Sequence, residues 1–304
     1  MRKRPILFGF IITSIVLVIF GSMLVLSLWM LRGLRGESSL FNLGDSVAII
    51  EIRGVILDSR GVIEQLRKYD DDGGIKAIIL RIESPGGTVG PSQEIYQEVM
   101  RIRNQGNEDG KPVVASMGSV AASGGYYIAA AADRIVANPG TITGSIGVVM
   151  EFLNYEGVYE WAGLKSNVIK TGRFKDIGSP TREMSQDERD LLQTMIESVL
   201  DQFVGAIVEG RSMDQSLVRE NADGRVFSGQ QALELGFVDE LGNLQVAIDL
   251  AAQLAGIEDE PNVIYPPRRQ QRGLFYMLFR GAADAFFDAA AQHDTGDLKL
   301  LYCQ

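Results

Sequence analysis

The 304-residue sequence has one histidine, His293, and one cysteine, Cys303. A single cysteine excludes a disulfide within the chain, and one His with one Cys cannot build a zinc cluster of those ligands. His293 lies in a polar stretch near the C-terminus, far from the glycine-rich segments. A serine nucleophile in this chain would therefore need a base other than histidine. We expect neither a metal nor an organic cofactor.

Positive charge is also scarce, since 29 Lys and Arg face 39 Asp and Glu and the net charge is −10. Proteins that bind nucleic acid usually present a basic face to the phosphates. The composition therefore argues against a nucleic-acid partner.

Charged side chains are absent from Pro5 to Leu31, a run of 27 positions. A bilayer span needs about 20 apolar residues, and the apolar part of a cleavable signal peptide is shorter. No alanine precedes Ala48, so a small-residue cleavage site is missing. We therefore expect residues 1–32 to be a cytoplasmic stub and an uncleaved transmembrane anchor, with a buried core helix as the alternative.

The basic residues around this run set an expected orientation. Arg2, Lys3 and Arg4 precede it, and Arg32 and Arg35 follow it. The positive-inside bias modestly favours a cytoplasmic N-terminus. The rest of the chain would then face outside the cytoplasm, on a single-pass protein of the inner (cytoplasmic) membrane.

Residues 33–45 form a polar linker, and the pattern from 46 to 265 predicts one large α/β domain. Apolar runs predict strands over 46–52, 75–82, 113–117, 134–137, 144–149, 166–170 and 263–265. Helical spacing predicts helices over 60–69, 92–103, 123–132, 155–162, 185–209 and 244–254, and a turn with a short helix over 221–237. Ser185 and Glu188 form an expected capping box. The alternation of strands and helices favours a largely parallel sheet.

The last segment, 266–304, begins with prolines and arginines and continues with apolar and aromatic residues. This composition predicts an amphipathic helix. We expect it to pack against the chain's own core or a neighbouring subunit, with a membrane-surface helix as the alternative.

Ser123, in the small-residue stretch from Ala121 to Tyr127, is the candidate nucleophile. It follows a predicted strand and opens a predicted helix, where backbone N–H groups such as that of Gly124 are free and favour negative charge. A second turn, Ser84–Gly87, ends another buried strand, and its glycine N–H groups are candidates for binding an oxyanion. Tyr126 and Tyr127 are expected to pack the helix.

The base must then be a lysine or a carboxylate, and a lysine can act because its neutral amine accepts the proton of a serine. Only eight lysines occur, and most fall in segments that indicate surface or strand edge. Lys175 lies in a loop rich in small and turn residues, where functional side chains are common. Asp176, the next residue, is expected to be a solvated or capping carboxylate.

Together these segments resemble the signal peptide peptidase A family, membrane-anchored serine proteases with a Ser–Lys dyad. The resemblance covers Ile79 to about Glu240. The matching segments are Ser84–Gly87, Met117–Tyr127, Thr141–Val148, Lys175–Met184, Asp223–Phe227 and Val238–Glu240. It implies a fold similar to the Clp protease and crotonase families, a spiral of ββα units.

By position, the resemblance implies that Ser123 is the nucleophile and Lys175 the general base. It implies that the N–H of Gly87, beside that of Gly124, contributes to the oxyanion hole, and that Ser145 orients the lysine amine. It also implies a homo-oligomeric ring or dome, in which one site is built either within one chain or from two adjacent chains.

The implied activity is cleavage of remnant signal peptides and similar apolar peptides at the membrane. Two alternatives remain at this point: a crotonase-like acyl-CoA enzyme, and a membrane scaffold without activity. The acyl-CoA enzymes usually rely on carboxylates and lack an anchor, and a scaffold does not need Ser123, Lys175 and Ser145. All three share the expected fold.

Overall fold

The computed structural model describes residues 21–23, 45–105 and 110–265. Gly21–Met23 are helical and exposed. The rest of the expected anchor and linker, the expected tail, His293 and Cys303 lie outside the described residues. The fold below is that of the compact unit that ends at Ile264.

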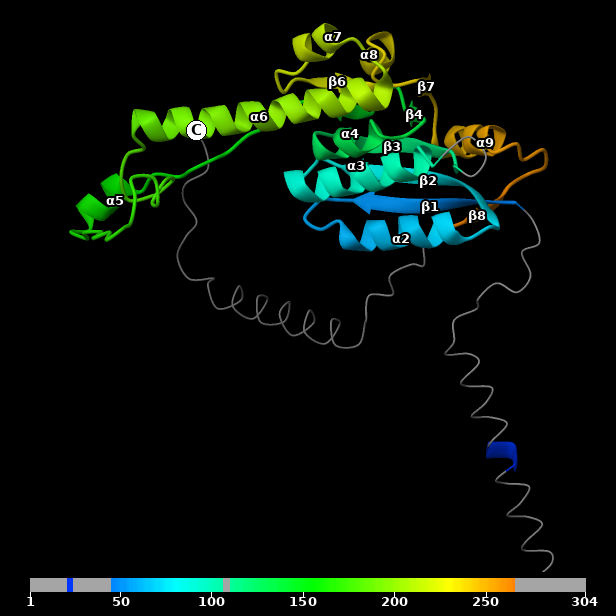
Figure 1. The fold of residues 1–304 in the computed structure, drawn as a ribbon, viewed down its shortest axis with the longest axis horizontal. Helices are drawn as coiled ribbons and strands as arrows, with labels where there is room; N and C mark the ends of the chain where they lie inside the picture. Colours follow the sequence, from blue (N-terminus) through cyan, green and yellow to red (C-terminus); the bar gives the residue numbers. More distant parts are fainter. Residues whose placement is uncertain (1–20, 24–44, 106–109, 266–304) are drawn as a thin grey trace, which may run out of the picture. The chain divides into compact units, whose positions relative to one another are not determined.

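A largely parallel sheet forms the centre of this unit (Figure 1). Its strands are β1 (Ser46–Arg53), β2 (Ile75–Ser84), β3 (Val113–Ala122), β4 (Arg134–Ala137), β5 (Ile142–Gly144), β6 (Val226–Ser228), β7 (Glu240–Leu241) and β8 (Asn262–Ile264). The order is β6-β5-β3-β2-β1-β8, and β4 pairs with both β3 and β7. Only the β5–β6 pair is antiparallel. The predicted α/β class with a largely parallel sheet is confirmed.

Helices connect the strands, as parallel pairing requires. They are α2 (Arg60–Asp71), α3 (Val89–Arg103), α4 (Gly124–Ala129), α5 (Glu156–Trp161), α6 (Gln186–Arg211), α7 (Gln215–Glu220), α8 (Gly229–Glu234) and α9 (Leu244–Leu254). Most agree with the predicted helices to within a few residues.

Both faces of the sheet are buried, because the long strands are apolar at nearly every position. In β2, Ile78, Leu80 and Ile82 belong to one core cluster, which α2, α3, α4 and the second half of α6 complete. Ala77 and Ile79 face the opposite way, into a smaller cluster that α9 covers. The period of two along each strand therefore produces two apolar layers from one sheet.

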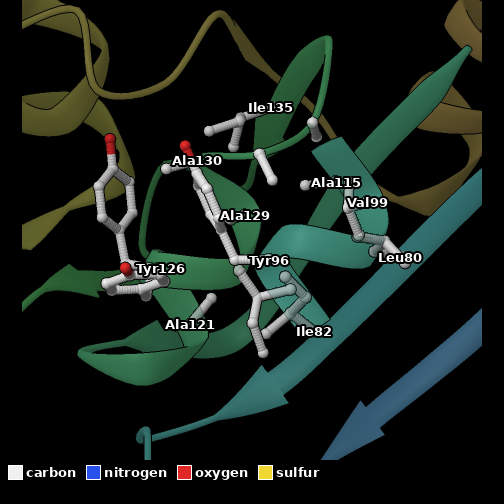
Figure 2. Packing of buried hydrophobic residues seen from close by; sticks show 14 of the residues in the cluster. Leu80, Ile82, Tyr96, Val99, Ala115, Ala121, Tyr126, Ala129, Ala130 and Ile135 are labelled. Carbon is white, nitrogen blue, oxygen red and sulfur yellow. The ribbon is translucent and has the colours of Figure 1, made fainter. Parts of the chain in front are cut away.

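The short helix α4 is anchored in the larger cluster, as Figure 2 shows for Tyr126 and Ala129. The Tyr126 hydroxyl is buried and donates a hydrogen bond to the Phe237 carbonyl at 3.0 Å. The Tyr127 ring packs against Phe203, with 4.8 Å between ring centroids. The predicted packing role of both tyrosines is confirmed, and it fixes the start of α4.

Helix α6 begins at the expected capping box, since the Ser185 side chain accepts from the Glu188 N–H and Glu188 accepts from the Ser185 backbone. Its second half is packed into the core through Phe203, Val204 and Ile207. Its first half is largely exposed and extends beyond the sheet (Figure 1). In the part of the chain that the structure describes, α6 alone is long and apolar enough to cross a membrane by length and composition.

Two predicted strands are wrong. The strand expected over 144–149 is instead β5, which ends at Gly144, because positive φ values at Gly144 (77°) and Ser145 (50°) turn the chain out of the extended conformation. Residues 166–170 are not a strand, since no neighbouring strand supplies hydrogen bonds. Strands β6 and β7 and helix α7 were not predicted. They are short, and the Asp214 side chain rather than an apolar stripe fixes α7.

Candidate active site

Ser123 lies between β3 and α4 in a strained conformation, with φ 52° and ψ −121°. Residues with a side chain rarely adopt this region, and the strain costs of order 1–3 kcal/mol. Two backbone hydrogen bonds hold it, from the Ser123 N–H to Gly144 at 2.8 Å and from the Tyr127 N–H to the Ser123 carbonyl at 2.8 Å. The side chain is partly exposed. A serine is thus presented on a tight turn at the C-terminal end of the central strand β3.

The turn after β2 packs directly against Ser123. Gly86 has φ 107°, and a Cβ on it would lie 2.7 Å from the Ser123 Cβ. A Cβ on Gly87 would lie 2.1 Å from the Ile56 carbonyl oxygen. The Ser84 hydroxyl accepts from the Gly86 N–H at 3.1 Å. Both glycines are therefore required for this close approach.

We expect Gly86→Ala to lower the free energy of unfolding by about 1–3 kcal/mol, because the new Cβ meets Ser123 and positive φ disfavours alanine. Urea denaturation measures this loss. Gly90→Ala is the matched control, since a Cβ there meets nothing within 4 Å. Equal stability of the two variants would show that the packing described here is not needed.

Two backbone donors lie beside the serine. Neither the Gly87 N–H nor the Gly124 N–H donates to an acceptor among residues 45–105 and 110–265. They are close together, because a Cβ on Gly124 would lie 3.3 Å from the Gly87 nitrogen. Gly124 begins α4, so its N–H is one of the free groups of a helix start. Paired free N–H groups beside a serine are what an oxyanion requires.

Ser145 and Ser123 directly follow the ends of two paired strands, β5 and β3. Ala122 and Gly144 are partners across β3 and β5, and each serine is the residue that follows. Both serines line a cavity of about 520 Å³. The structure therefore brings together Ser123, Ser145, Gly87 and Gly124, four of the five predicted site residues.

Residues of α6 and of two loops complete this cavity: Gly147, Val148, Val149, Gln193, Ile196, Glu197, Leu200, Ala222, Asp223 and Gly224. None of these lining residues is a lysine or a histidine. Arg225, through its hydrogen bonds, lowers the pKa of the Asp223 carboxyl to about 2, so this carboxylate is a weak base. A larger cavity of about 710 Å³ shares Val149, Gln193 and Ile196 with the first.

Lys175 is the fifth predicted site residue, and within one chain it does not lie beside Ser123. It lies on an exposed turn between α5 and α6 and is absent from the lining of the serine cavity. It makes no hydrogen bond or ion pair with any residue that the structure describes. In a single chain the serine and this lysine are therefore not in contact.

Glu83, the last residue before the Ser84 turn, was not predicted from the sequence. Its carboxylate accepts from the Ser119 N–H at 3.0 Å and from the Val120 N–H at 3.3 Å, where β3 bulges before Ser123. A Cβ on Gly118 would lie 1.7 Å from a Glu83 oxygen. A carboxylate that ends an apolar strand beside a glycine turn was the available signal.

Among residues 45–105 and 110–265, no group of three or more His, Cys, Asp or Glu side chains is placed to hold a metal ion. The chemistry that this site supports therefore involves a serine, a second serine and backbone donors. Besides its two serines, the cavity lining offers the carboxylates of Glu197 and Asp223 but no lysine or histidine as a proton acceptor.

Two protein-family profiles match the part of the chain that contains this site. The sequence profile of peptidase family S49 matches residues 105–258, and that of Clp protease matches residues 46–139. A Synechocystis sp. protein, named provisionally as protease slr0021, is 43% identical over 215 residues, which are 70% of this chain and 76% of that protein.

Two further relatives carry more specific names. An Enterococcus faecium protein, named provisionally as signal peptide peptidase SppA, is 37% identical over 66% of this chain and 61% of its own length. Protease 4 of Haemophilus influenzae is 35% identical over 70% of this chain and 35% of its own length. The fold is that of the Clp protease type, and the chain belongs to peptidase family S49, a family of serine proteases.

Proposed function

We propose that Ser123 is the nucleophile of this peptidase and that the N–H groups of Gly87 and Gly124 bind the oxyanion. The observation that carries the proposal is the strained turn at Ser123 beside two N–H groups without acceptors among the described residues. The Ser123 oxygen attacks the peptide carbonyl carbon, and the negative charge that develops on the carbonyl oxygen is stabilised by the two donors. The leaving amine departs, and water releases the acyl group from the serine.

The proton of Ser123 goes to the neutral amine of Lys175, which then passes it to the leaving amine. Ser145 orients this amine from its place beside Ser123. The lysine comes from a neighbouring copy of the chain. This step is supported by the lack of Lys or His in the cavity lining and by the exposed Lys175 without a partner among the described residues.

The segment that carries Lys175 has the surface of an interface. We call residues 147–195 the arm, which includes α5 and the first half of α6. Its exposed apolar side chains are Val149, Met150, Phe152, Leu153, Tyr155, Val158, Trp161, Leu164, Val168, Ile169, Leu191 and Met195. So many exposed apolar groups on one segment mark a contact surface. Repeated contact of one chain's arm with the next chain's serine cavity forms a ring or dome if the rotation closes.

Mixing inactive Ser123→Ala and Lys175→Ala chains is expected to restore activity. A site made of a Ser123 from one chain and a Lys175 from the next is intact at about a quarter of the contacts in an equal random mixture. Hydrolysis of an apolar reporter peptide measures the recovery after the two chains are unfolded and refolded together. Mass spectrometry must confirm mixed assemblies. Inactive mixed assemblies would place both groups of the dyad in one chain.

The substrates that fit are apolar, extended peptides, because Val148, Val149, Ile196 and Leu200 line the serine cavity. Remnant signal peptides have this character, and the name of the Enterococcus faecium relative supports the class. Residues 1–32 anchor the protein in the inner membrane, residues 33–45 link the anchor to the protease domain (46–265), and that domain faces outside the cytoplasm.

A fluorophosphonate probe tests the proposal directly, since it modifies activated serines. We expect labelling on Ser123 in the wild-type assembly and none in the Ser123→Ala chain. A wild-type assembly that is not labelled would favour the acyl-CoA or scaffold alternative.

A further inference from the structure

A network of charged side chains fixes the turn that carries Lys175. The residues of this network have no role in the mechanism proposed above. We propose that Arg182 is a positioning residue for Lys175. It ties the Lys175 turn to the start of α6 and occupies the Asp176 carboxylate, so that the lysine amine is presented without a counter-charge. This inference rests on the proposed role of Lys175 as the base.

The Arg182 side chain binds both the carboxylate and the main-chain carbonyl of Asp176, the residue after Lys175. The Arg182 Nε donates to the Asp176 Oδ2 at 3.1 Å, and the Arg182 Nη2 donates to the Asp176 carbonyl at 3.2 Å. Lys170 also donates to the Asp176 carboxylate. The Asp176 side chain is only 13% exposed and is paired with Arg182 and Lys170, so the prediction of a solvated or capping carboxylate is wrong.

The other side of Arg182 is fixed to α6. Its Nη1 donates to the Glu188 Oε2 at 2.8 Å and its Nη2 to the Glu188 Oε1 at 2.5 Å. This bidentate geometry fixes the direction of both side chains. The Glu188 side chain is 4% exposed, and it also accepts from the Ser185 N–H at 2.9 Å in the capping box. Hydrogen bonds to the Glu188 carboxylate, first from Arg182 and then from the Ser185 N–H, lower the pKa of Glu188 to about 2.

The Lys175 turn has a second support within the arm, from the ring of Phe152. Gly178 has φ 75°, and a Cβ on it would lie 2.5 Å from a ring carbon of Phe152. The Ser179 N–H donates to the Asp176 carbonyl at 3.0 Å. The backbone on the C-terminal side of Lys175 is therefore fixed at several points, whereas the Lys175 side chain itself is exposed.

This arrangement also decides which cation pairs with Asp176. A carboxylate next to a lysine stabilises the charged amine, and a charged amine cannot act as a base. Arg182 first, and then Lys170, hold the pKa of Asp176 well below its usual range, so its charge is compensated by residues other than Lys175. The charged groups around the turn come from three segments: Lys170, Arg173 and Asp176 of the loop, Arg182, Glu183, Asp187, Glu188 and Arg189 from α6 and the segment before it, and Glu151 from the segment of Phe152.

The test compares full-length, assembled variants by kcat/KM for an apolar reporter peptide as a function of pH. For Arg182→Gln we expect a loss of about a hundredfold from misplacement of the turn. We also expect the midpoint of its pH profile to rise by about one unit, because Asp176 becomes free to pair with Lys175. Adding Asp176→Asn to Arg182→Gln returns the midpoint to the wild-type value.

Two further variants separate charge from geometry. Arg182→Lys keeps the charge but loses the bidentate fork, so the midpoint stays near wild type while the rate recovers only in part. The control is Arg219→Gln, which removes an ion pair to Asp201 at the exposed surface between α6 and α7 and leaves both rate and midpoint unchanged.

An Arg182→Gln assembly with wild-type helix content that stays within about threefold of wild-type kcat/KM would overturn the inference. A loss of rate with an unmoved midpoint would also overturn it, since it would indicate a purely structural role. If Arg182→Gln fails to fold, Arg182→Lys takes its place, and a kcat/KM for Arg182→Lys within about threefold of the wild-type value would overturn the inference. Absence of probe labelling on wild-type Ser123 would instead overturn the proposed function, and this inference with it.

Discussion

Replacing Ser123 by alanine abolishes peptide cleavage, with an expected loss on the order of 10⁴ to 10⁶ in kcat. The hydroxyl is the only group lost, and the Ser123 side chain donates no hydrogen bond to any described residue. The backbone bonds to Gly144 and from Tyr127 remain. Alanine tolerates the positive φ no worse than serine does, so the free energy of unfolding should stay close to that of wild type.

Ser123→Gly separates activity from stability. Glycine removes the nucleophile as alanine does, but it relieves the strain at φ 52° and should raise the free energy of unfolding by about 1 kcal/mol. Ser119→Ala, on the exposed bulge of β3, is the control that keeps activity. Reporter-peptide hydrolysis and urea denaturation measure the two quantities, and a Ser123→Ala chain that still cleaves would remove Ser123 from the mechanism.

Local patterns gave the regular elements of this fold because the energetic terms behind them are local. Helix α6 was predicted from its capping box, and that box is present at Ser185 and Glu188. The long strands β1 and β2 were predicted from apolar runs, which burial on both faces requires. The segment 166–170 failed for the opposite reason. Val168 and Ile169 have strand-like side chains, but a strand also needs a hydrogen-bonding neighbour, and no local pattern reports one.

The turn at Ser123 was predictable because the small residues that it requires are adjacent in the sequence. A serine that follows two alanines and precedes two glycines is visible in the stretch Ala121–Gly125, and the partner turn is visible at Gly86 and Gly87. The role of Glu83 was not visible, because the bulge that it fills forms only when β3 pairs with β2. The same holds for Arg182, whose two carboxylate partners are six residues away in opposite directions along the chain.

The position of Lys175 shows where a sequence argument about one chain stops. Motif order alone places the lysine in the same site as the serine. The fold instead places it on the arm, exposed and away from the cavity that Ser123 and Ser145 line. The exposed apolar residues of the arm, such as Phe152, Trp161 and Met195, are the physical reason to expect a second chain there.

Lys175→Ala is accordingly expected to reduce kcat nearly as much as Ser123→Ala, since a nucleophile and its base act as one unit. Lys165→Ala is the matched control, because Lys165 is an exposed lysine of the same arm and has no assigned role. Lys175→Arg should not restore activity, since arginine stays protonated and cannot accept the serine proton.

The pH profile then distinguishes a base from a residue that only supports the assembly. A lysine base acts when it is neutral, so wild-type kcat/KM should rise with pH and level off once the amine has lost its proton. In Lys175→Ala the residual activity should lose this rise, whereas in Lys165→Ala the rise is kept. Sizing of the assemblies must give the same mass for all three proteins, so that loss of the rise is not loss of the contact between chains. If Lys175→Arg cleaved the reporter peptide at the wild-type rate, or if the wild-type profile were flat, the proton acceptor would have to be a group other than Lys175.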